Sequence, residues 1–563
     1  MSAQERLTTT SRDGGSVDVA GAVIDHLELW TQAITQKSTA GRGGSSGKRG
    51  KIELTGIKKL RELILELAVR GKLVEQNPEH ETATKHLQNA VAEKNRLAKT
   101  VVIKKPKTLK PIPDDEALFE LPIGWSFARL SDIGYITNGN SISKADKESK
   151  YAKIDEGRPY IATKDVGYGF TPLNYDNGIR IPINENFKTA ERDSVLICSE
   201  GGSAGKKCGI TTREISFGNK LYALKPFVNT ASRFILAFYL TPSFQRQFIE
   251  RMTGIIGGIS LSKFETIILP VPPLEEQHCI VQKVDELMAL CDRLEQQTSD
   301  QLDAHEALVD TLLDTLTQSE NATELAENWA HLGAHFDTLF STEQSIDNLK
   351  KTVLDLAANG KLVAFNAEER ALKSILSFGP RNGLSPKECS SSTGLKVLKL
   401  GATTKGKLDL DESKDVDIHE PESSHLWLKS GDILIQRGNA ASHVGCNIIL
   451  VEDYPNFIYP DLMMKIRVKE EADPSFISIY LSAPKSRKFM WDRMTGTSGT
   501  MPKISKKVVE AIPISLPDMA TQQATIAKID ELMALCDQLK ERLNQASDTR
   551  CQLAGAVVER ALN

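Results

Sequence analysis

One segment of the sequence carries residue types that could bind phosphate. Residues 199–207, SEGGSAGKK, are rich in glycine and end in two lysines. A phosphate-binding loop needs Gly, four further residues, then Gly-Lys and a Ser or Thr whose hydroxyl binds magnesium. Here Glu200 takes the position of the first Gly, and Lys207 replaces the hydroxyl residue. We therefore expect a flexible polar loop and not a nucleotide site.

A second segment could bind a metal. His331 and His335 lie four residues apart, as the ligands of helical zinc sites do, but Leu332 stands where a catalytic Glu would be and no third ligand is evident. The eight cysteines are scattered singly with no CxxC pair, a pattern typical of reduced thiols in the cytoplasm. We expect no metal site, and a surface helix around the two histidines.

Other catalytic motifs are missing from the sequence. No strand is followed by a Gly-rich S-adenosylmethionine loop. There is no Asn-Pro-Pro-aromatic or Asp-Pro-Pro-Tyr motif and no cluster of acidic residues with a lysine that would suit a nuclease. We predict that this chain is not an enzyme and binds no cofactor.

The chain repeats itself, and this is its strongest internal signal. LRELILELAVRGKLVEQN at 60–77 recurs as LKKTVLDLAANGKLVAFN at 349–366. RMTG begins at Arg251 and again at Arg493, and the octapeptide DELMALCD begins at Asp285 and is repeated unchanged from Asp530. Three recurrences in the same order indicate a duplication into two tandem units, at about 54–318 and 345–563.

Each unit contains a strand-rich region with the same order of segments. RPYIATKDV, SVLICSEGG, CGITT and LYALKPF in the first correspond to LKVLKLGAT, GDILIQRGN, CNIILVE and LMMKIRV in the second. These short β-branched or aromatic runs, broken by Gly, Asn and Asp, are typical of strands. One helix with aromatic residues is expected after each set, at 232–252 and 474–494. The pattern predicts a mixed α+β domain in each unit.

The segments after these domains have coiled-coil spacing. The first seam is Gln277, Ile280, Val284, Leu287, Cys291, Leu294 and Thr298, and the second is Ile529, Leu532, Cys536, Leu539 and Leu543. Apolar residues at alternating steps of three and four need a partner helix. We expect the two seams to be each other's partners in an intramolecular coiled coil with approximate two-fold symmetry. Another helix is expected within 319–344.

Composition limits the class of protein without deciding it. The chain has 563 residues, enough for several domains, and 26% of them are charged. No apolar run approaches the roughly 20 residues that span a bilayer, and the first residues do not resemble a secretion signal. We expect a cytoplasmic protein that does not bind membranes. The net charge of −4 gives no support to nucleic-acid binding, although local basic loops would suffice for it.

Particular motifs give the chain a resemblance to a known family. A domain that opens with LPIGW (residues 121–125) and closes with LPVPPLEEQ (residues 269–277) before a coiled coil resembles the type I restriction-modification specificity subunit. The helix ending in GKLV ahead of each domain and the duplicated octapeptide are also similar to that family. The second unit departs from the pattern, since it has no LPxGW and its domain closes with LPDMATQQ; its segment ILSFGPRNGLS still parallels DIGYITNGNS.

The resemblance implies a function and partners. It implies two target-recognition domains, each reading one half of a bipartite, asymmetric site in double-stranded DNA. It also implies two methyltransferase (modification) subunits that bring S-adenosylmethionine, and restriction/motor subunits that bring ATP and Mg. A helical section of about 21 residues would be roughly 32 Å long, near the ~34 Å of one DNA turn. It could therefore set the unread gap between the two half-sites.

The resemblance also implies domain boundaries. We expect a disordered tail at 1–52, a helical region and linker at 53–119 and the first target-recognition domain at 120–275. A central helical spacer at 276–366, the second domain at 367–517 and a coiled-coil helix at 518–563 complete the chain. The alternative is a non-catalytic coiled-coil adaptor whose two domains bind ligands other than DNA.

Polar loops at strand ends are the expected DNA-reading elements, because Arg, Lys and short polar side chains read base edges and phosphates. In the first domain the candidates are Asn138, Asn140, Ser143, Lys144, Thr163, Lys164, Ser199, Glu200, Ser203, Lys206 and Lys207. In the second they are Arg381, Asn382, Ser385, Thr403, Thr404, Lys405, Gln436, Arg437, Asn439, Ser442 and His443. Phosphate contacts are expected from Ser262, Lys263, Lys503, Ser505 and Lys506. Loop position alone supports each of these, so the sets are firmer predictions than any single residue.

Overall fold

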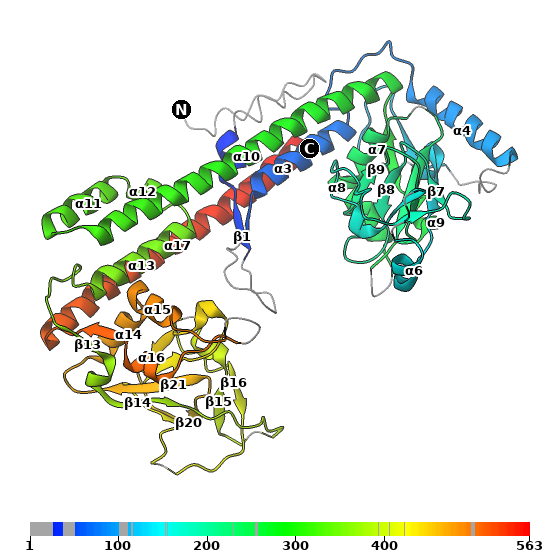
Figure 1. Cartoon of the computed structure of the whole chain (residues 1–563). Helices are drawn as coiled ribbons and strands as arrows, with labels where there is room; N and C mark the ends of the chain where they lie inside the picture. The colour runs from blue at the N-terminus through cyan, green and yellow to red at the C-terminus, as the bar shows by residue number, and fades with distance from the viewer. Residues whose placement is uncertain are drawn as a thin grey trace. The chain divides into compact units, whose positions relative to one another are not determined.

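The chain folds as two compact units, and neither is one continuous stretch of sequence (Figure 1). The computed structural model describes residues 26–37, 51–100, 111–113, 116–152, 154, 156–228, 230–253, 257–391, 393–404, 406–421, 423–496 and 501–562. Unit 1 is built mainly from Leu54–Thr298 and Thr549–Asn563, and unit 2 mainly from Ser299–Asp548. The predicted division at 54–318 and 345–563 is therefore wrong at its edges, since each long helix contributes to both units.

Three helices of unit 1 pack lengthwise around one shared apolar core. They are α3 (Thr55–Val69), the first part of α10 (Leu274–Gln318) and the last part of α17 (Met519–Leu562). Apolar side chains of all three share one core: Leu60, Ile64 and Leu67 of α3, Ile280, Val284, Leu287 and Cys291 of α10, and Ala554 and Val558 of α17. Arg61 on α3 pairs with Asp292 and Glu295 on α10, both at 2.7 Å.

Unit 2 uses the corresponding pieces in the same way. Its helix α13 (Glu343–Ala358) packs against the first part of α17 and the last part of α10. The shared core contains Ile346, Leu349 and Val353 of α13, Ile529 and Cys536 of α17, and Val309, Leu313 and Leu316 of α10. Lys350 on α13 pairs with Asp537, just as Arg61 pairs with Asp292 at the repeat-equivalent positions. The helices α11 (Ala322–Ala334) and α12 (Phe336–Leu339) lie between α10 and α13 in sequence, as predicted for 319–344.

The predicted intramolecular coiled coil is confirmed, because α10 and α17 share a core in each unit. The predicted pairing of the two heptad seams with each other is wrong. The seam from Gln277 to Thr298 packs against α3, and the seam from Ile529 to Leu543 packs against α13. Each seam is completed by the far end of the other long helix and not by its repeat-equivalent stretch. The helices are also longer than the predicted 21 shared residues, because α10 has 45 residues and α17 has 44. The extra turns diverged in sequence, so the repeat did not reveal them.

The strand-rich domain of unit 1 holds two four-stranded sheets. One has the order β4-β11-β8-β9, formed by Gly134–Asn138, Leu221–Pro226, Val195–Cys198 and Cys208–Ile210. The other has the order β6-β5-β10-β7, formed by Arg180–Ile181, Arg158–Ile161, Ile215–Phe217 and Thr189–Ala190. A short ribbon of β3 (Ser126–Arg129) with β12 (Ile268–Val271) joins the two ends of the domain.

The domain of unit 2 has the same topology strand for strand. Its first sheet has the order β14-β21-β18-β19, formed by Leu376–Asn382, Met463–Val468, Ile433–Gln436 and Asn447–Ile449. Its second sheet has the order β16-β15-β20-β17, formed by Ser413–Asp415, Lys396–Leu398, Tyr454–Ile458 and Trp427–Leu428. The closing ribbon pairs β13 (Glu369–Ala371) with β22 (Pro513–Ser515). The second domain therefore opens at β13 although it lacks the LPxGW motif.

The aromatic helix predicted after each set of strands is two helices in each unit. In unit 1 these are α7 (Ser232–Tyr239) and α8 (Pro242–Arg251), and in unit 2 α14 (Pro474–Ser482) and α15 (Pro484–Trp491). The single-helix prediction is wrong because Pro242 and Pro484 cannot donate the backbone hydrogen bond that would continue the first helix. Proline is well tolerated at the first turn, so a second helix starts there.

A glutamine fixes each domain to its long helix. The fully buried Gln277 of α10 accepts a hydrogen bond from the Ala231 amide at 3.0 Å and donates to the Pro272 carbonyl at 3.1 Å. Gln522 of α17 accepts from the Asp473 amide at 2.8 Å and donates to the Pro517 carbonyl at 2.8 Å. The two closing motifs, LPVPPLEEQ and LPDMATQQ, thus share the one residue that makes this joint.

The LPIGW motif closes the same joint in unit 1. The Trp125 indole is buried and donates to the Glu276 carboxylate at 3.0 Å and to the Gln76 side chain at 3.2 Å. Gly71 ends α3 with φ of +67°, and a side chain there would meet Pro122 and Trp125. Unit 1 also contains α4 (Ala83–Lys99), α5 (Leu130–Ile133), α6 (Lys144–Ser149) and α9 (Leu261–Phe264), and unit 2 also contains α16 (Lys506–Glu510).

The N-terminal segment is ordered in part. Residues Leu27–Gln32 form α2, and Trp30 is buried in the core of unit 1, where the Ala33 carbonyl accepts a hydrogen bond from the Gly56 amide. Strands β1 (Thr35–Lys37) and β2 (Lys51–Glu53) pair with each other. The prediction of a disordered tail over all of 1–52 is therefore wrong for residues 26–37 and 51–52. Residues 1–25 and 38–50, like 101–110 of the predicted linker, lie outside the described residues.

Candidate nucleic-acid interface

The polar loops predicted in the first domain lie together. Lys144, on the α6 helix that follows β4, and Lys164, after β5, line one cavity of about 750 Å³. Lys207, at the end of the Gly-rich loop, donates to the Thr163 carbonyl at 3.3 Å. The Gly-rich loop is joined in turn to the loop after RMTG by a bridge between Glu200 and Gly258. Four segments far apart in sequence thus converge on one region of the domain.

Several of these residues also have internal roles. The Lys188 ammonium donates to Asn138 at 2.6 Å and the Lys188 amide to Asn140 at 2.8 Å, so both asparagine side chains are held within the domain. The Ser143 hydroxyl accepts from the Asp146 amide at 3.0 Å and caps α6. Lys144, Lys164, Lys206, Ser262 and Lys263 are exposed, and Ser203 is half-buried.

The loops of the second domain converge in the same way. The Arg437 carbonyl accepts from the Ile504 amide at 2.9 Å, and Gly438 forms a bridge with Lys503, which joins the loop after β18 to the loop after RMTG. The loop after β14 is tied to the start of β21, where Ser385 donates to Asp461 at 2.5 Å. Ser505 caps α16 through the Val508 amide, and Lys506 is exposed. Ser442 is exposed, His443 and Thr404 are half-buried, and Lys405 lies outside the described residues.

Three predicted DNA-contacting side chains are buried. Ser199 lies beneath the Gly-rich loop, while Gln436 donates to the Thr403 hydroxyl at 2.8 Å and to the Leu400 carbonyl at 3.1 Å. Asn439 donates to Gln436 at 2.6 Å, which ties the loop to this interior pair. Ser199, Thr403 and Gln436 therefore shape the loops from inside and have no access to a duplex. The strands β8 and β18 are buried at every residue, so alternation along them could not have indicated this inward direction.

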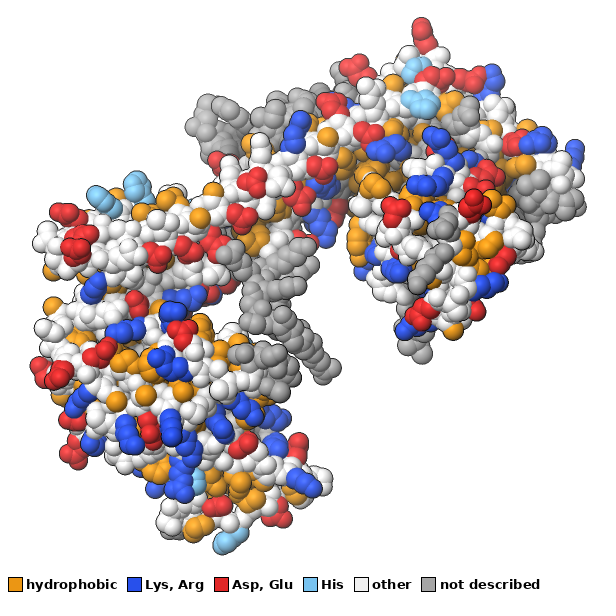
Figure 2. Space-filling model, viewed as in Figure 1, with side chains coloured by type: hydrophobic (Ala, Val, Ile, Leu, Met, Phe, Trp, Pro, Cys, Tyr) orange, Lys and Arg blue, Asp and Glu red, His pale blue; other side chains and the backbone are white. Residues whose placement is uncertain are grey.

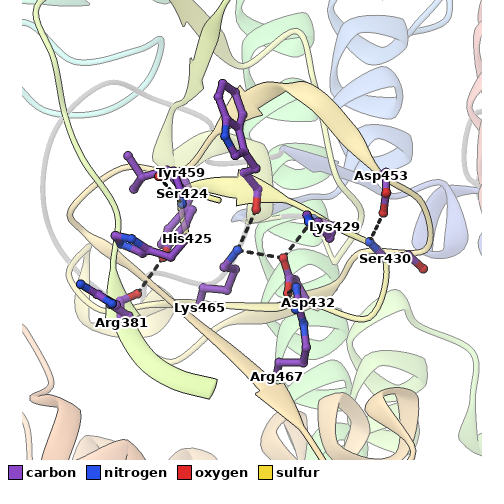
Figure 3. A network of polar contacts seen from close by, with 12 residues as sticks. Arg381, Ser424, His425, Lys429, Ser430, Asp432, Asp453, Tyr459, Lys465 and Arg467 are labelled. Atoms are coloured by element: carbon purple, nitrogen blue, oxygen red, sulfur yellow. Dashed lines mark hydrogen bonds and ion pairs between the residues drawn. The ribbon is translucent and has the colours of Figure 1, made fainter. Parts of the chain in front are cut away.

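An ion-pair network holds the central sheet of the second domain (Figure 3). Lys465, 3% exposed on β21, pairs with the fully buried Asp432 at 3.0 Å and donates to the Trp427 carbonyl at 2.7 Å. Arg467 donates to the other oxygen of Asp432. Burial lowers the pKa of Lys465, and the Asp432 carboxylate opposes that shift. At the repeat-equivalent positions the first domain has Ser194 and Ala223, so this network is particular to the second domain.

The network supports the backbone of Arg381, the strongest base-reading candidate in this domain. Arg381 pairs with Lys465 across the β14–β21 ladder, its carbonyl accepts from Tyr459 Oη at 3.1 Å, and His425 bonds the Asn382 carbonyl at 3.4 Å. The Arg381 side chain is exposed. Figure 2 shows Lys and Arg side chains gathered over the face that carries β14 and β21. A fixed backbone with an exposed guanidinium suits bidentate hydrogen bonding to a base edge.

Sequence reasoning missed three cations near the predicted loops of the first domain. Lys147 and Arg180 line the same cavity as Lys144 and Lys164, and Lys188 bonds Asn138. Lys147 follows Lys144 by three residues, so helical spacing could have placed both on one face of α6. Nothing in the sequence indicated Arg180, because its strand β6 has only two residues.

Comparison with known proteins identifies the family. The family model for the type I restriction modification DNA specificity domain matches residues 122–304 and 368–546. Over 618 aligned positions the chain is 35% identical to the type I restriction enzyme EcoAI specificity subunit of Escherichia coli, covering 97% of this chain and 100% of that protein. The chain belongs to the type I restriction-modification specificity family.

Two further members of this specificity family are similar along most of the chain. The EcoEI specificity subunit of Escherichia coli is 32% identical, covering 96% of this chain and 99% of that protein. The EcoKI specificity subunit of Escherichia coli strain K12 is 25% identical, covering 76% and 86%. Family membership confirms the sequence-based resemblance, and the two matched ranges fall on the two domains with identical topology.

The described residues were also compared with the requirements of a metal site and of a membrane-spanning helix, and they meet neither. No group of three or more His, Cys, Asp or Glu side chains there could hold a metal ion. His331 and His335 are both exposed, on and just after α11. Within the same part of the chain, no helix is long and apolar enough to cross a membrane.

Proposed function

We propose that this chain is the DNA-reading specificity subunit of a type I restriction-modification enzyme. Its target-recognition domains, at 120–275 and 367–517, would each read one half of a bipartite, asymmetric site in double-stranded DNA. The observation that carries the proposal is the pairing of one repeated fold with two different loop surfaces. The two domains share strand order and helix joint, whereas the residues their loops expose differ.

Base recognition is proposed for the polar residues that remain accessible. In the first domain these lie around Lys206 and Lys207, and in the second around Arg381 and Arg437. Phosphate contacts are proposed for Lys263, Lys503 and Lys506. The catalytic steps, with S-adenosylmethionine, ATP and Mg, would come from partner subunits, and the complex as a whole would be the site-specific deoxyribonuclease.

The repeated octapeptide supports two copies of one docking surface. Its inward residues Leu287, Met288 and Cys291 pack in the core of unit 1, which explains why they are retained. Its outward residues are retained too: Leu290 is 45% exposed, and its repeat-equivalent Leu535 is 54% exposed. Internal packing does not require an exposed leucine to be identical in both copies. A partner present twice would require it, and we assign the two surfaces to the two methyltransferase subunits.

The docking assignment is tested by charge substitution. Leu290→Lys alone should reduce the complex to one methyltransferase subunit per chain, and Leu290→Lys with Leu535→Lys should abolish assembly. Gln297→Lys, at an exposed position of α10 whose repeat-equivalent residue is Arg542, provides the control. Unchanged stoichiometry in the double variant, measured by native mass spectrometry, would remove the assignment.

DNA reading is tested by footprinting. The chain copurified with its methyltransferase subunit should protect two separated patches of a DNA fragment from nuclease cleavage. The fragment should carry the sequence that the complex methylates. One continuous patch, or no protection above that of unrelated DNA, would contradict the proposal. Binding of a protein or glycan in place of DNA would favour the coiled-coil adaptor that was the alternative prediction.

A further inference from the structure

One cavity in the first domain is lined mainly by basic side chains. It has a volume of about 750 Å³ and lies between α6 and the β5–β6 edge of the second sheet. Its charged lining consists of Lys144, Lys147, Lys164, Arg180 and a single acid, Glu148. Four cations against one carboxylate around a hollow of this size suit a bound anion.

The described residues of the domain do not neutralise most of these cations. Glu148 reaches only Lys144, at 3.9 Å. The Lys147 ammonium lies 5.3 Å from the centre of the Tyr160 ring, and Arg180 donates to the Gly157 carbonyl at 3.4 Å. Among the described residues no carboxylate lies within 4 Å of Lys147, Lys164 or Arg180. Three positive charges are therefore available to an external ligand.

The same edge of the second domain has the opposite charge. Strand β16 is the repeat-equivalent of β6, since each is the outer strand beside β15 or β5. The segment 409–417 that contains β16 reads DLDESKDVD, with five acidic residues and one lysine. The topology is shared while the charge is inverted, so an anion would be attracted to this edge in one domain and repelled in the other.

We propose that the cavity lined by Lys147, Lys164 and Arg180 binds a DNA backbone phosphate beside the half-site read by the first domain, and that the second domain has no such site at its corresponding edge. This proposal rests on the proposed function. Phosphate is the ligand because DNA carries a dense row of phosphodiesters and cations clustered without acid partners match it. The first domain would then supply the more salt-sensitive part of binding, and the two half-sites would be held unequally.

The test measures the dissociation constant of the complex with its methyltransferase subunit for DNA carrying its own site, from 50 to 200 mM salt. Lys147→Ala, Lys164→Ala and Arg180→Ala together remove three cations. Each neutralised phosphate contributes about 0.9 to the slope of log affinity against log salt, so loss of the one phosphate in this cavity should lower the slope by about 0.9. Over that fourfold change in salt, the unaltered complex should lose roughly 3- to 4-fold more affinity than the variant. The sequence recognised should not change.

The matched control removes three cations from the corresponding edge of the second domain, as Lys396→Ala, Lys399→Ala and Lys414→Ala, and should leave the slope unchanged. The conservative set Lys147→Arg, Lys164→Arg and Arg180→Lys should restore the original slope. Should the triple variant fail to assemble, Lys164→Ala alone, which removes an exposed side chain, should still lower the slope, by no more than about 0.9.

The outcomes separate this proposal from the proposed function. If the unaltered complex prefers no bipartite sequence, the proposed function itself fails. If it does prefer one but the cavity variant keeps the unaltered slope, only the phosphate site is wrong. A variant that recognises a different sequence in the first half-site would also overturn the proposal, because the cavity would then read bases.

Discussion

The joint between each domain and its long helix can be tested at Gln277. Gln277→Leu keeps the volume of the side chain but removes two hydrogen bonds, leaving the Ala231 amide and the Pro272 carbonyl without their partner in a buried site. Each stranded buried polar group costs about 1–3 kcal/mol, so the two together cost about 2–6 kcal/mol. Since about 1.4 kcal/mol corresponds to a factor of ten, local opening at the joint should become at least roughly 30 times more frequent.

Hydrogen exchange read by mass spectrometry measures that opening peptide by peptide, which suits a chain whose two units need not unfold together. Faster exchange is expected around residues 228–240 and 268–280, with no change in the second domain. Gln522→Leu should speed exchange in the second domain and leave the first domain unchanged. Its effect should be equal or larger, because Gln522 also donates to the Glu471 carbonyl at 3.0 Å. Gln297→Leu, at an exposed position of α10, is the control. Exchange in Gln277→Leu no faster than in that control would refute the role of the glutamine joint.

Three further predictions concern other parts of the chain. Gly71→Ala should destabilise unit 1 by about 2–5 kcal/mol, because φ at this residue is +67° and the new Cβ would lie 2.5 Å from Pro122. The control Gly555→Ala adds a Cβ in open space within α17 and should be neutral or slightly stabilising, and thermal unfolding compares the two variants. Burial raises the pKa of the Glu276 carboxyl above its usual 4.5, so the stability contributed by the protonated carboxyl is fully present below pH 4.5 and is lost as the pH rises through the raised pKa. Glu276→Gln should abolish this loss of stability, which urea unfolding of unit 1 at several pH values measures. Arg381→Ala should weaken discrimination at one position of the second half-site by about 1–3 kcal/mol and leave the first half-site unchanged, and methylation of a randomised site library measures both.

The repeat predicted the architecture because the retained residues are those that make the joints. Gly71 and Gly360 end equivalent helices with left-handed φ, and Asp292 and Asp537 pair with equivalent cations on α3 and α13. The spacing of the apolar residues indicates that each heptad seam packs against another helix. It does not indicate which helix that is. Leu60 and Leu349, close in sequence to their own domains, proved to lie on those helices.

The candidate site was predictable as loops but not as side chains. Strand ends indicated where polar residues would gather, and the cavity shared by Lys144 and Lys164 agrees with that. Local sequence could not show that Gln436 points inward to Thr403, nor that Arg180 comes from a two-residue strand to complete the cavity. These features depend on contacts between segments far apart along the chain.

Exchange of one domain tests the central claim most directly. Residues 120–270 would be replaced by the corresponding domain of another family member, with the glutamine joint retained, and the methylated sequence read from the whole genome of the host. The account predicts a new first half-site, an unchanged second half-site and an unchanged gap. A change in both halves, or in neither, would contradict it.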